Sequence, residues 1–189
     1  MTLLLCGKYR LYCGNEGSNR NNEPIMIVGV VCLKIELKVN GKLRRAEVGV
    51  SERLIDVLRQ KFGLVSVKEG CGAGECGACT VLLDGEAVCS CVVPAFQTEG
   101  HDILTVEGLE ENGELDVIQQ SFIDCDAIQC GFCTPGMIMS AKALLLKNPL
   151  PSRDEIRTAL AGNICRCTGY TQILDAVETA AERIREDLQ

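Results

Sequence analysis

Residues 71–79 read CGAGECGAC, and a fourth cysteine, Cys91, follows after eleven further residues. A C-x4-C-x2-C run with a distant fourth cysteine is the plant-type pattern that holds a [2Fe–2S] cluster. Gly72, Gly74 and Gly77 let the backbone turn closely around sulfur, so that its N–H groups can donate to the thiolates. The stretch therefore predicts a loop that binds a cluster through Cys71, Cys76, Cys79 and Cys91.

Two points about this first set stay open from the residues alone. A structural zinc site is an alternative, but zinc sites usually pair two C-x2-C knuckles, and this spacing fits them poorly. Cys89 lies two residues before Cys91, and in a strand both would face the same side. The interval favours Cys91 as the ligand, and we interpret Cys89 as a small buried residue near the site.

A second set of four cysteines occurs in QCGFCTPG (residues 129–136) and NICRCTGY (residues 163–170). Each pair is expected between two helices, just before the second, where free N–H groups and partial positive charge would offset a negative cluster. A thioredoxin-like C-x2-C redox pair is the alternative, but it leaves the C-x-C pair unexplained. The pattern predicts a second [2Fe–2S] cluster bound by Cys130, Cys133, Cys165 and Cys167.

The sequence around the first set alternates like half-buried strands. Asn40-Gly41 and Asp84-Gly85 favour tight hairpin turns, and Ser51 is expected to cap a helix over residues 53–62. Two hairpins around one helix indicate a β-grasp arrangement. The expected strands are residues 33–39, 42–48, 80–83, 86–88 and 103–106.

Beyond about residue 108 the periodicity becomes helical and predicts an antiparallel four-helix bundle. Thr134-Pro135 is expected to start one helix, and Ser152 with Glu155 forms a capping box for the next. The fold class is therefore α+β. The expected domains are a flexible extension (1–30, with Met26 an alternative start), a ferredoxin-like domain (31–107) and a helical domain (108–189). The expected helices are residues 115–125, 136–147, 154–160 and 172–188.

Composition narrows the functional classes. The 189 residues carry a net charge of −7 and only 4% aromatic residues, which disfavours nucleic acid as a partner. No apolar run is long enough to span a membrane, and Leu3–Leu5 is too short for the apolar region of an export signal. We therefore expect a cytoplasmic protein and metal binding by its 13 cysteines rather than disulfides. The single histidine, His101, has no recognisable catalytic partner in the sequence, so no catalytic residue is predicted.

Three motifs together resemble a known family. CGAGECGACTVLLDG (71–85) with Cys91, IQCGFCTPGMIM (128–139) and GNICRCTGY (162–170) resemble the small iron–sulfur subunit of molybdenum hydroxylases, the xanthine dehydrogenase, aldehyde oxidoreductase and carbon monoxide dehydrogenase family. The resemblance runs from about residue 32 to about residue 182 and includes all eight cysteines in order and spacing.

The resemblance implies a plant-type ferredoxin domain followed by a four-helix [2Fe–2S] domain, in an electron-transfer subunit without a substrate site. It implies a large partner subunit with molybdenum and a pterin dinucleotide, and a medium subunit with FAD. It implies that Gln129 contacts the pterin, and that electrons pass from the Cys130 set to the Cys71 set and then to FAD. A stand-alone two-cluster ferredoxin-like carrier and a zinc-stabilised interaction module are the rival hypotheses.

Overall fold

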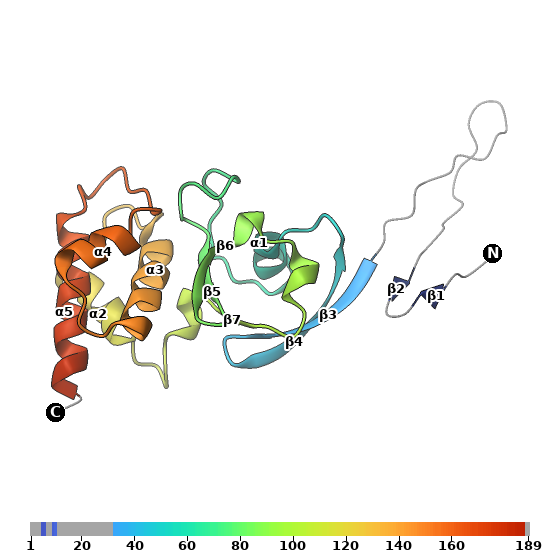
Figure 1. Cartoon of the computed structure of the whole chain (residues 1–189), viewed down its shortest axis with the longest axis horizontal. Helices are drawn as coiled ribbons and strands as arrows, with labels where there is room; N and C mark the ends of the chain where they lie inside the picture. The colour runs from blue at the N-terminus through green and yellow to red at the C-terminus, as the bar shows by residue number, and fades with distance from the viewer. Residues whose placement is uncertain (1–4, 7–8, 11–31, 188–189) are drawn as a thin grey trace.

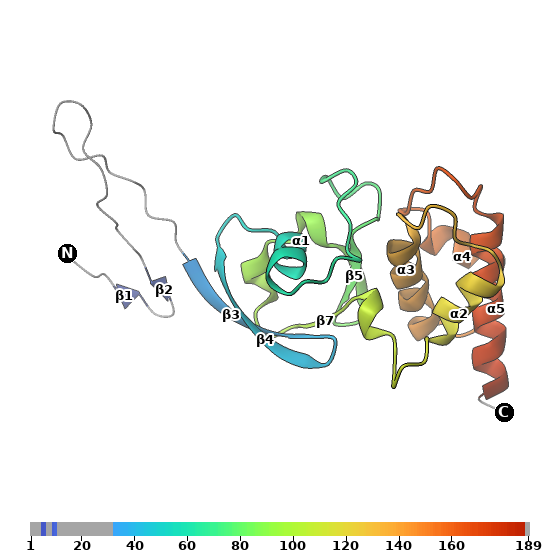
Figure 2. The same cartoon turned by 180° about the vertical axis from the view of Figure 1, so that it is seen from behind.

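The computed structural model describes residues 5–6, 9–10 and 32–187, and the predicted extension lies outside them apart from two short strands. These are β1 (Leu5–Cys6) and β2 (Tyr9–Arg10), and Arg10 pairs with Cys32. The rest forms a sheet part, residues 32–104, and a helical part, residues 117–187. Figures 1 and 2 show the helices stacked to one side of the sheet.

The sheet part consists of two antiparallel hairpins bridged by one further strand. β3 (Cys32–Val39) pairs with β4 (Lys42–Gly49), and β5 (Thr80–Leu83) pairs with β6 (Glu86–Cys89). β7 (Asp102–Leu104) lies between them, parallel to β3 and antiparallel to β5. The order β4-β3-β7-β5-β6 places the hairpin before the first cysteine loop and the hairpin after it in one sheet.

The predicted turn chemistry is confirmed in both hairpins. Asn40 and Gly41 have φ of 50° and 74°, and Asp84 and Gly85 have φ of 50° and 86°. Two successive residues with positive φ form the type I′ turn whose twist matches that of paired strands.

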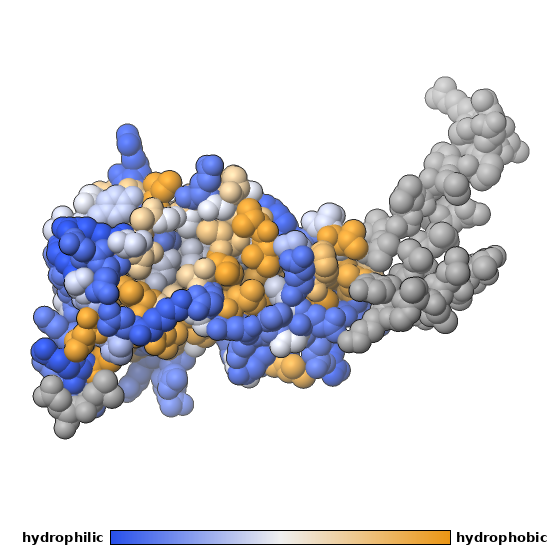
Figure 3. All heavy atoms as spheres, in the orientation of Figure 1, coloured by the Kyte–Doolittle hydropathy of each residue, from blue (hydrophilic) through white to orange (hydrophobic). Residues whose placement is uncertain are grey.

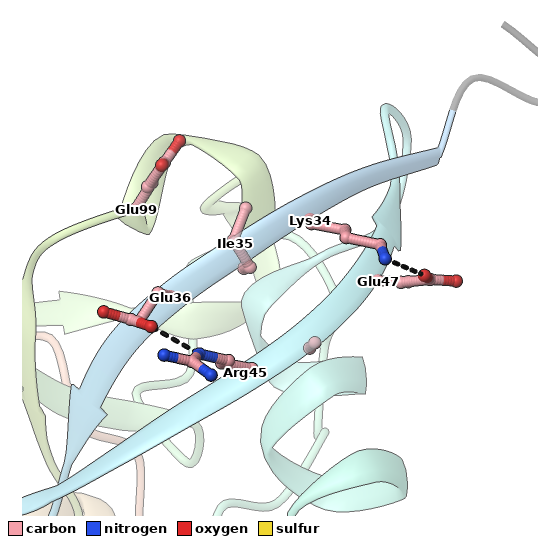
Figure 4. A pocket seen from close by; sticks show the side chains of 7 residues that line it. Lys34, Ile35, Glu36, Arg45, Glu47 and Glu99 are labelled. Atoms are coloured by element: carbon pink, nitrogen blue, oxygen red, sulfur yellow. Dashed lines mark hydrogen bonds and ion pairs between the residues drawn. The ribbon is translucent and has the colours of Figure 1, made fainter. Parts of the chain in front are cut away.

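Side chains of β3 alternate between the core and solvent, as the sequence predicts, and those facing the core are Leu33, Ile35, Leu37 and Val39. On the open face, Lys34 lies 3.4 Å from Glu47 and Arg45 lies 2.5 Å from Glu36 (Figure 4). These exposed cross-strand pairs contribute little energy, but they match the register in which Lys34 lies opposite Glu47.

The predicted helix over residues 53–62 is confirmed with a different start and shape. It consists of α1 (Leu54–Asp56) and one π-helical segment, η1 (Val57–Lys61), and buries Leu54, Val57 and Leu58 as expected. Ser51 does not cap it. Arg53 occupies the N-cap position, and its guanidinium hydrogen-bonds both Asp56 and Glu69.

Short 3-10 segments follow the last two strands. η2 (Ser90–Val92) comes directly after β6, and η3 (Ala95–Thr98) begins two residues after η2. The strand expected over residues 103–106 is β7, which ends at Leu104, and η4 (Val106–Gly108) follows. Asn40 accepts a hydrogen bond from the Thr105 amide at 2.9 Å, which turns the chain away from the sheet there.

The helical part contains the four predicted helices: α2 (Val117–Asp124), α3 (Thr134–Lys147), α4 (Arg153–Ala159) and α5 (Thr171–Asp187). The capping box of Ser152 and Glu155 starts α4 as predicted, and Asp116 with Gln119 forms a second one at α2. The sequence assigned the N-cap of α3 to Thr134, but Thr134 is the first helical residue and Cys133 occupies the N-cap position.

Two hydrophobic cores lie side by side. One contains the inner face of β3 with Leu54, Val57 and Leu58, and the other contains Phe122, Met137 and Ile173 of the helices. Leu82 of β5 belongs to the helical core, so α3 packs directly on the sheet (Figure 1). None of the helices among the described residues is long and apolar enough to cross a membrane.

Candidate metal centres

The first cysteine set lies at the edge of the sheet part. Residues 71–79 form an irregular loop before β5, and Cys91 reaches it from η2. Cys79 and Cys91 are 2% and 3% exposed and lie near enough for each thiol to shift the pKa of the other, whereas Cys71 is exposed and interacts with the Cys76 thiol. The fold thus brings all four predicted residues together as two sulfur pairs.

The loop backbone prepares Cys71 to act as a thiolate. The N–H groups of Ala73 and Glu75 each donate to the Cys71 Sγ at 3.3 Å, and backbone bonds of this kind lower the pKa of the Cys71 thiol to about 6. Burial has the opposite effect on the partner pair: it raises the pKa of Cys79 and raises the pKa of Cys91 to about 11. Because metals bind thiolates, Cys71 is ready at neutral pH, while Cys79 and Cys91 would release protons on binding.

Cys89 lies beside the first set with a contact of its own. It ends β6, is half-buried, and its thiol donates to the carbonyl oxygen of Gly74 at 3.5 Å. The expectation that residues 89 and 91 share one face of a strand is wrong, because Cys91 lies in a 3-10 segment. Both thiols lie near the Cys79 thiol, and the two cysteines differ in burial, since Cys91 is buried and Cys89 is half-buried.

The second cysteine set joins two loops of the helical part. Cys130 and Cys133 precede α3, and Cys165 and Cys167 precede α5, as predicted. The Sγ atoms of Cys130 and Cys167 are 3.7 Å apart at the surface, and the less exposed Cys133 and Cys165 lie near enough for each thiol to shift the pKa of the other. Each pair therefore combines one cysteine from each loop.

In the second set, too, the surroundings shift the pKa values of the cysteine thiols in opposite directions. Burial alone would raise the pKa of Cys165, but the hydroxyl and amide of Thr168 donate to its sulfur at 3.0 and 3.5 Å and lower the pKa to about 7. The Phe132 amide lowers the pKa of Cys130, while burial raises the pKa of Cys133 to about 12. The hydrogen bond with Cys130 raises the pKa of Cys167.

The donor sets fit two-iron clusters better than single ions. Within the described residues, no group of three or more His, Cys, Asp or Glu side chains could hold one metal ion. A tetrahedral zinc site would require all four sulfurs to lie within roughly 4 Å of one another. In both sets the sulfurs meet two by two, and a [2Fe–2S] cluster divides its four thiolates between two irons in that way.

Two further predicted positions have clear surroundings. Gln129 is exposed next to the exposed Cys130, at the outer end of the second set. His101 is a partly exposed loop residue, and its Nδ1 lies 2.5 Å from the Asp84 carboxylate. This pair lies on the open hairpin surface, joins a turn to the start of β7, and touches neither cysteine set.

Sequence reasoning missed the residues that hold the loops in place. Thr168 bonds the Cys165 sulfur, and the Tyr170 hydroxyl accepts a hydrogen bond from the Cys165 amide at 2.9 Å. Asn163, 5% exposed, donates to the carbonyl of Gly77 in the first loop at 3.1 Å. All three lie within or next to the second C-x-C pair, so proximity to the cysteines was the available signal.

Exposed apolar side chains flank both sets in the sequence. Val92 follows Cys91, Phe132 lies between Cys130 and Cys133, and Ile164 precedes Cys165; each is 46–58% exposed. Figure 3 shows apolar patches interrupting the hydrophilic surface over both the sheet and the helices. Exposed apolar groups of this kind are typical of surfaces that another protein covers.

Comparisons with known proteins agree with these two centres. A model described as "2Fe-2S iron-sulfur cluster binding domain" matches residues 37–105, and one described as "[2Fe-2S] binding domain" matches residues 105–178. The nicotinate dehydrogenase small FeS subunit of Eubacterium barkeri is 51% identical over 80% of this chain and 96% of its own length.

Two further relatives cover nearly as much. The xanthine dehydrogenase iron-sulfur-binding subunit of Escherichia coli O157:H7 is 47% identical over 77% of this chain and 92% of its own. The crystal structure of quinoline 2-oxidoreductase from Pseudomonas putida 86 contains a chain that is 46% identical, with a TM-score of 0.79 over 82% of this chain and 97% of that one.

Proposed function

Because the chain belongs to the family of small iron–sulfur subunits of molybdenum hydroxylases, we propose that it relays electrons within such an oxidoreductase through two [2Fe–2S] clusters. The observation that supports this most is the gathering of eight cysteines into two sets, with the sulfurs of each set meeting in pairs. A [2Fe–2S] cluster takes up and gives up one electron at a time.

Each set has a distinct role for its own residues. Cys71, Cys76, Cys79 and Cys91 hold one cluster, and Cys130, Cys133, Cys165 and Cys167 hold the other. Backbone N–H groups of the first loop and the hydroxyl of Thr168 donate to sulfur, and such bonds stabilise the thiolates and tune the potential of a cluster.

We assign the first set to a β-grasp ferredoxin-like domain, residues 31–107, and the second to a four-helix-bundle domain, residues 108–189. The two separate hydrophobic cores support this division, as do the family models, which meet at residue 105. Gly108 ends the short η4 segment between the two parts.

The direction of electron flow follows from which set faces a partner. The large subunit of the complex, with molybdenum and a pterin dinucleotide, docks at the outer end of the second set. The exposed Gln129 then contacts the pterin, and the exposed Cys130 is the nearest sulfur. The Cys71 set passes electrons on to FAD in a medium subunit. The exposed Phe132 and Ile164 support docking at this surface.

Isolation of the chain from its source cells tests the assignment. The relay subunit brings with it a large partner and molybdenum, together with about four irons per chain. A stand-alone two-cluster carrier would carry the same iron but no partner and no molybdenum. Zinc in place of iron, in a colourless protein, would exclude both hypotheses.

A further inference from the structure

One buried side chain connects the loops of the two cysteine sets. Asn163 is 5% exposed and lies two residues before Cys165. Its Nδ2 donates to the carbonyl oxygen of Gly77 at 3.1 Å, and its Oδ1 accepts from the hydroxyl of Ser140 in α3 at 2.7 Å. The amide is thus held by one partner from the helical part and one from the sheet part.

A backbone hydrogen bond runs beside this contact. The N–H of Ile164 donates to the carbonyl oxygen of Cys76 at 3.0 Å. Ile164 is the chain neighbour of Cys165, and Cys76 belongs to the first set. A cysteine of one set is therefore separated from a cysteine of the other by a single hydrogen bond and one residue of backbone.

The packing at this contact leaves no room for side chains. A Cβ on Gly77, whose φ is 68°, would lie 2.4 Å from the Asn163 Nδ2 and 2.6 Å from the Gly162 oxygen. A Cβ on Gly136 of α3 would lie 2.1 Å from the Gly77 oxygen. The segment after Cys133 and the segment before Cys165 both touch the same peptide of the first loop. We call these residues, Gly77, Gly136, Asn163 and the Ile164–Cys76 pair, the seam.

We propose that Asn163 is a positioning residue that fixes the distance between the two cysteine sets, an inference that rests on the proposed relay function. Electron transfer between two centres slows exponentially with their separation, so a relay requires a constant separation. A buried amide with a partner on each side supplies this constraint, because leaving either partner unpaired is costly.

A buried asparagine could also serve stability alone, and the two roles differ in what a substitution changes. Loss of stability would follow in either case. Only a positioning role changes the magnetic interaction between the two reduced clusters, which falls steeply with distance. Thr98 offers a matched control: it is 0% exposed, and its hydroxyl donates to the Ala95 carbonyl at 2.7 Å, within the sheet part and outside the seam.

The experiment uses the full chain with its clusters, chemically reduced and examined by low-temperature EPR, in the wild type and in Asn163→Ala, Asn163→Asp and Thr98→Val. Asn163→Asp keeps the acceptor for Ser140 and removes the donor to Gly77. We expect both Asn163 variants to keep both cluster signals while the interaction between them weakens. Thr98→Val keeps the wild-type interaction. An unchanged interaction in both Asn163 variants would overturn the inference.

Amide hydrogen exchange gives a second readout that the wild type alone can supply. The Ile164 amide should be among the well-protected amides of the wild type and should exchange about tenfold faster in Asn163→Asp. An unprotected Ile164 amide in the wild type would overturn the inference without any variant. Failure of the wild type to bind two clusters would instead contradict the proposed function and leave the seam to be judged by exchange.

Discussion

Replacing Gly136 by alanine tests whether helix propensity or the close packing of α3 against Gly77 decides stability at this position. Gly136 is a buried residue in the first turn of α3. In a helix without tertiary contacts, replacing glycine by alanine stabilises by about 1 kcal/mol. Here the new Cβ would lie 2.1 Å from the Gly77 carbonyl oxygen and 3.1 Å from its carbonyl carbon. The contact is with backbone, which cannot rotate away, so α3 or the first loop must move.

The structure sets the expected magnitude. A carbon and an oxygen in contact need about 3 Å or more, so the overlap is on the order of 1 Å, and overpacking of this kind costs about 1–3 kcal/mol. The rigid neighbour puts Gly136→Ala near the upper end of that range. After the helix gain is subtracted, the variant should be about 2 kcal/mol less stable, which lowers the unfolding midpoint by roughly 4–8 °C.

Thermal unfolding of the iron-loaded protein, followed by far-ultraviolet circular dichroism at one fixed heating rate, measures this. Gly162→Ala is the control, because a Cβ there meets nothing within 4 Å and φ is not in the left-handed region. Its free energy of unfolding should stay within about 0.5 kcal/mol of the wild type, which is a shift of the midpoint by roughly 1–2 °C. A higher midpoint for Gly136→Ala, as helix propensity alone predicts, would refute close packing of α3 on Gly77.

Three further predictions concern single residues. Cys91→Ser should abolish the EPR signal of the first cluster while Cys89→Ser keeps it; loss of that signal in Cys89→Ser alone would reverse the assignment. Hydrogen bonds from Ser66 and Thr105 outweigh burial and lower the pKa of Glu107, so the stability that the carboxylate contributes is lost as the pH falls through that lowered pKa. In urea titrations at several pH values, Glu107→Gln should therefore lose less stability on acidification than the wild type. Equal losses in the two proteins would contradict this. Asp116→Ala removes both the N-cap of α2 and the carboxylate that lies 2.5 Å from Lys142. A urea titration should show a free energy of unfolding that is lower by roughly 2–3 kcal/mol, and a loss below about 0.5 kcal/mol would contradict this.

Local chemistry made much of the fold predictable. The Asn40-Gly41 and Asp84-Gly85 turns, the alternation along β3 and the Ser152 capping box each depend on a few neighbouring residues. Their strands and helices therefore lie where the sequence indicates. The cysteine spacings predicted which sulfurs would gather, because ligand geometry constrains sequence separation directly.

The errors arose where distant contacts decide local structure. Ser51 is a good capping residue, but Arg53 takes the N-cap position, and its bonds to Glu69 hold it there. The seam was out of reach for the same reason: Asn163 and Gly77 are 86 residues apart. A short polar residue beside a cysteine carries no local signal of the loop that it will meet.

The central claim is that the eight cysteines hold two separate [2Fe–2S] clusters. Low-temperature EPR of the dithionite-reduced protein, with spins counted against iron, tests this most directly. The account predicts two distinguishable two-iron signals, together about two spins and four irons per chain. One signal, or spin-silent protein with zinc in place of iron, would contradict it.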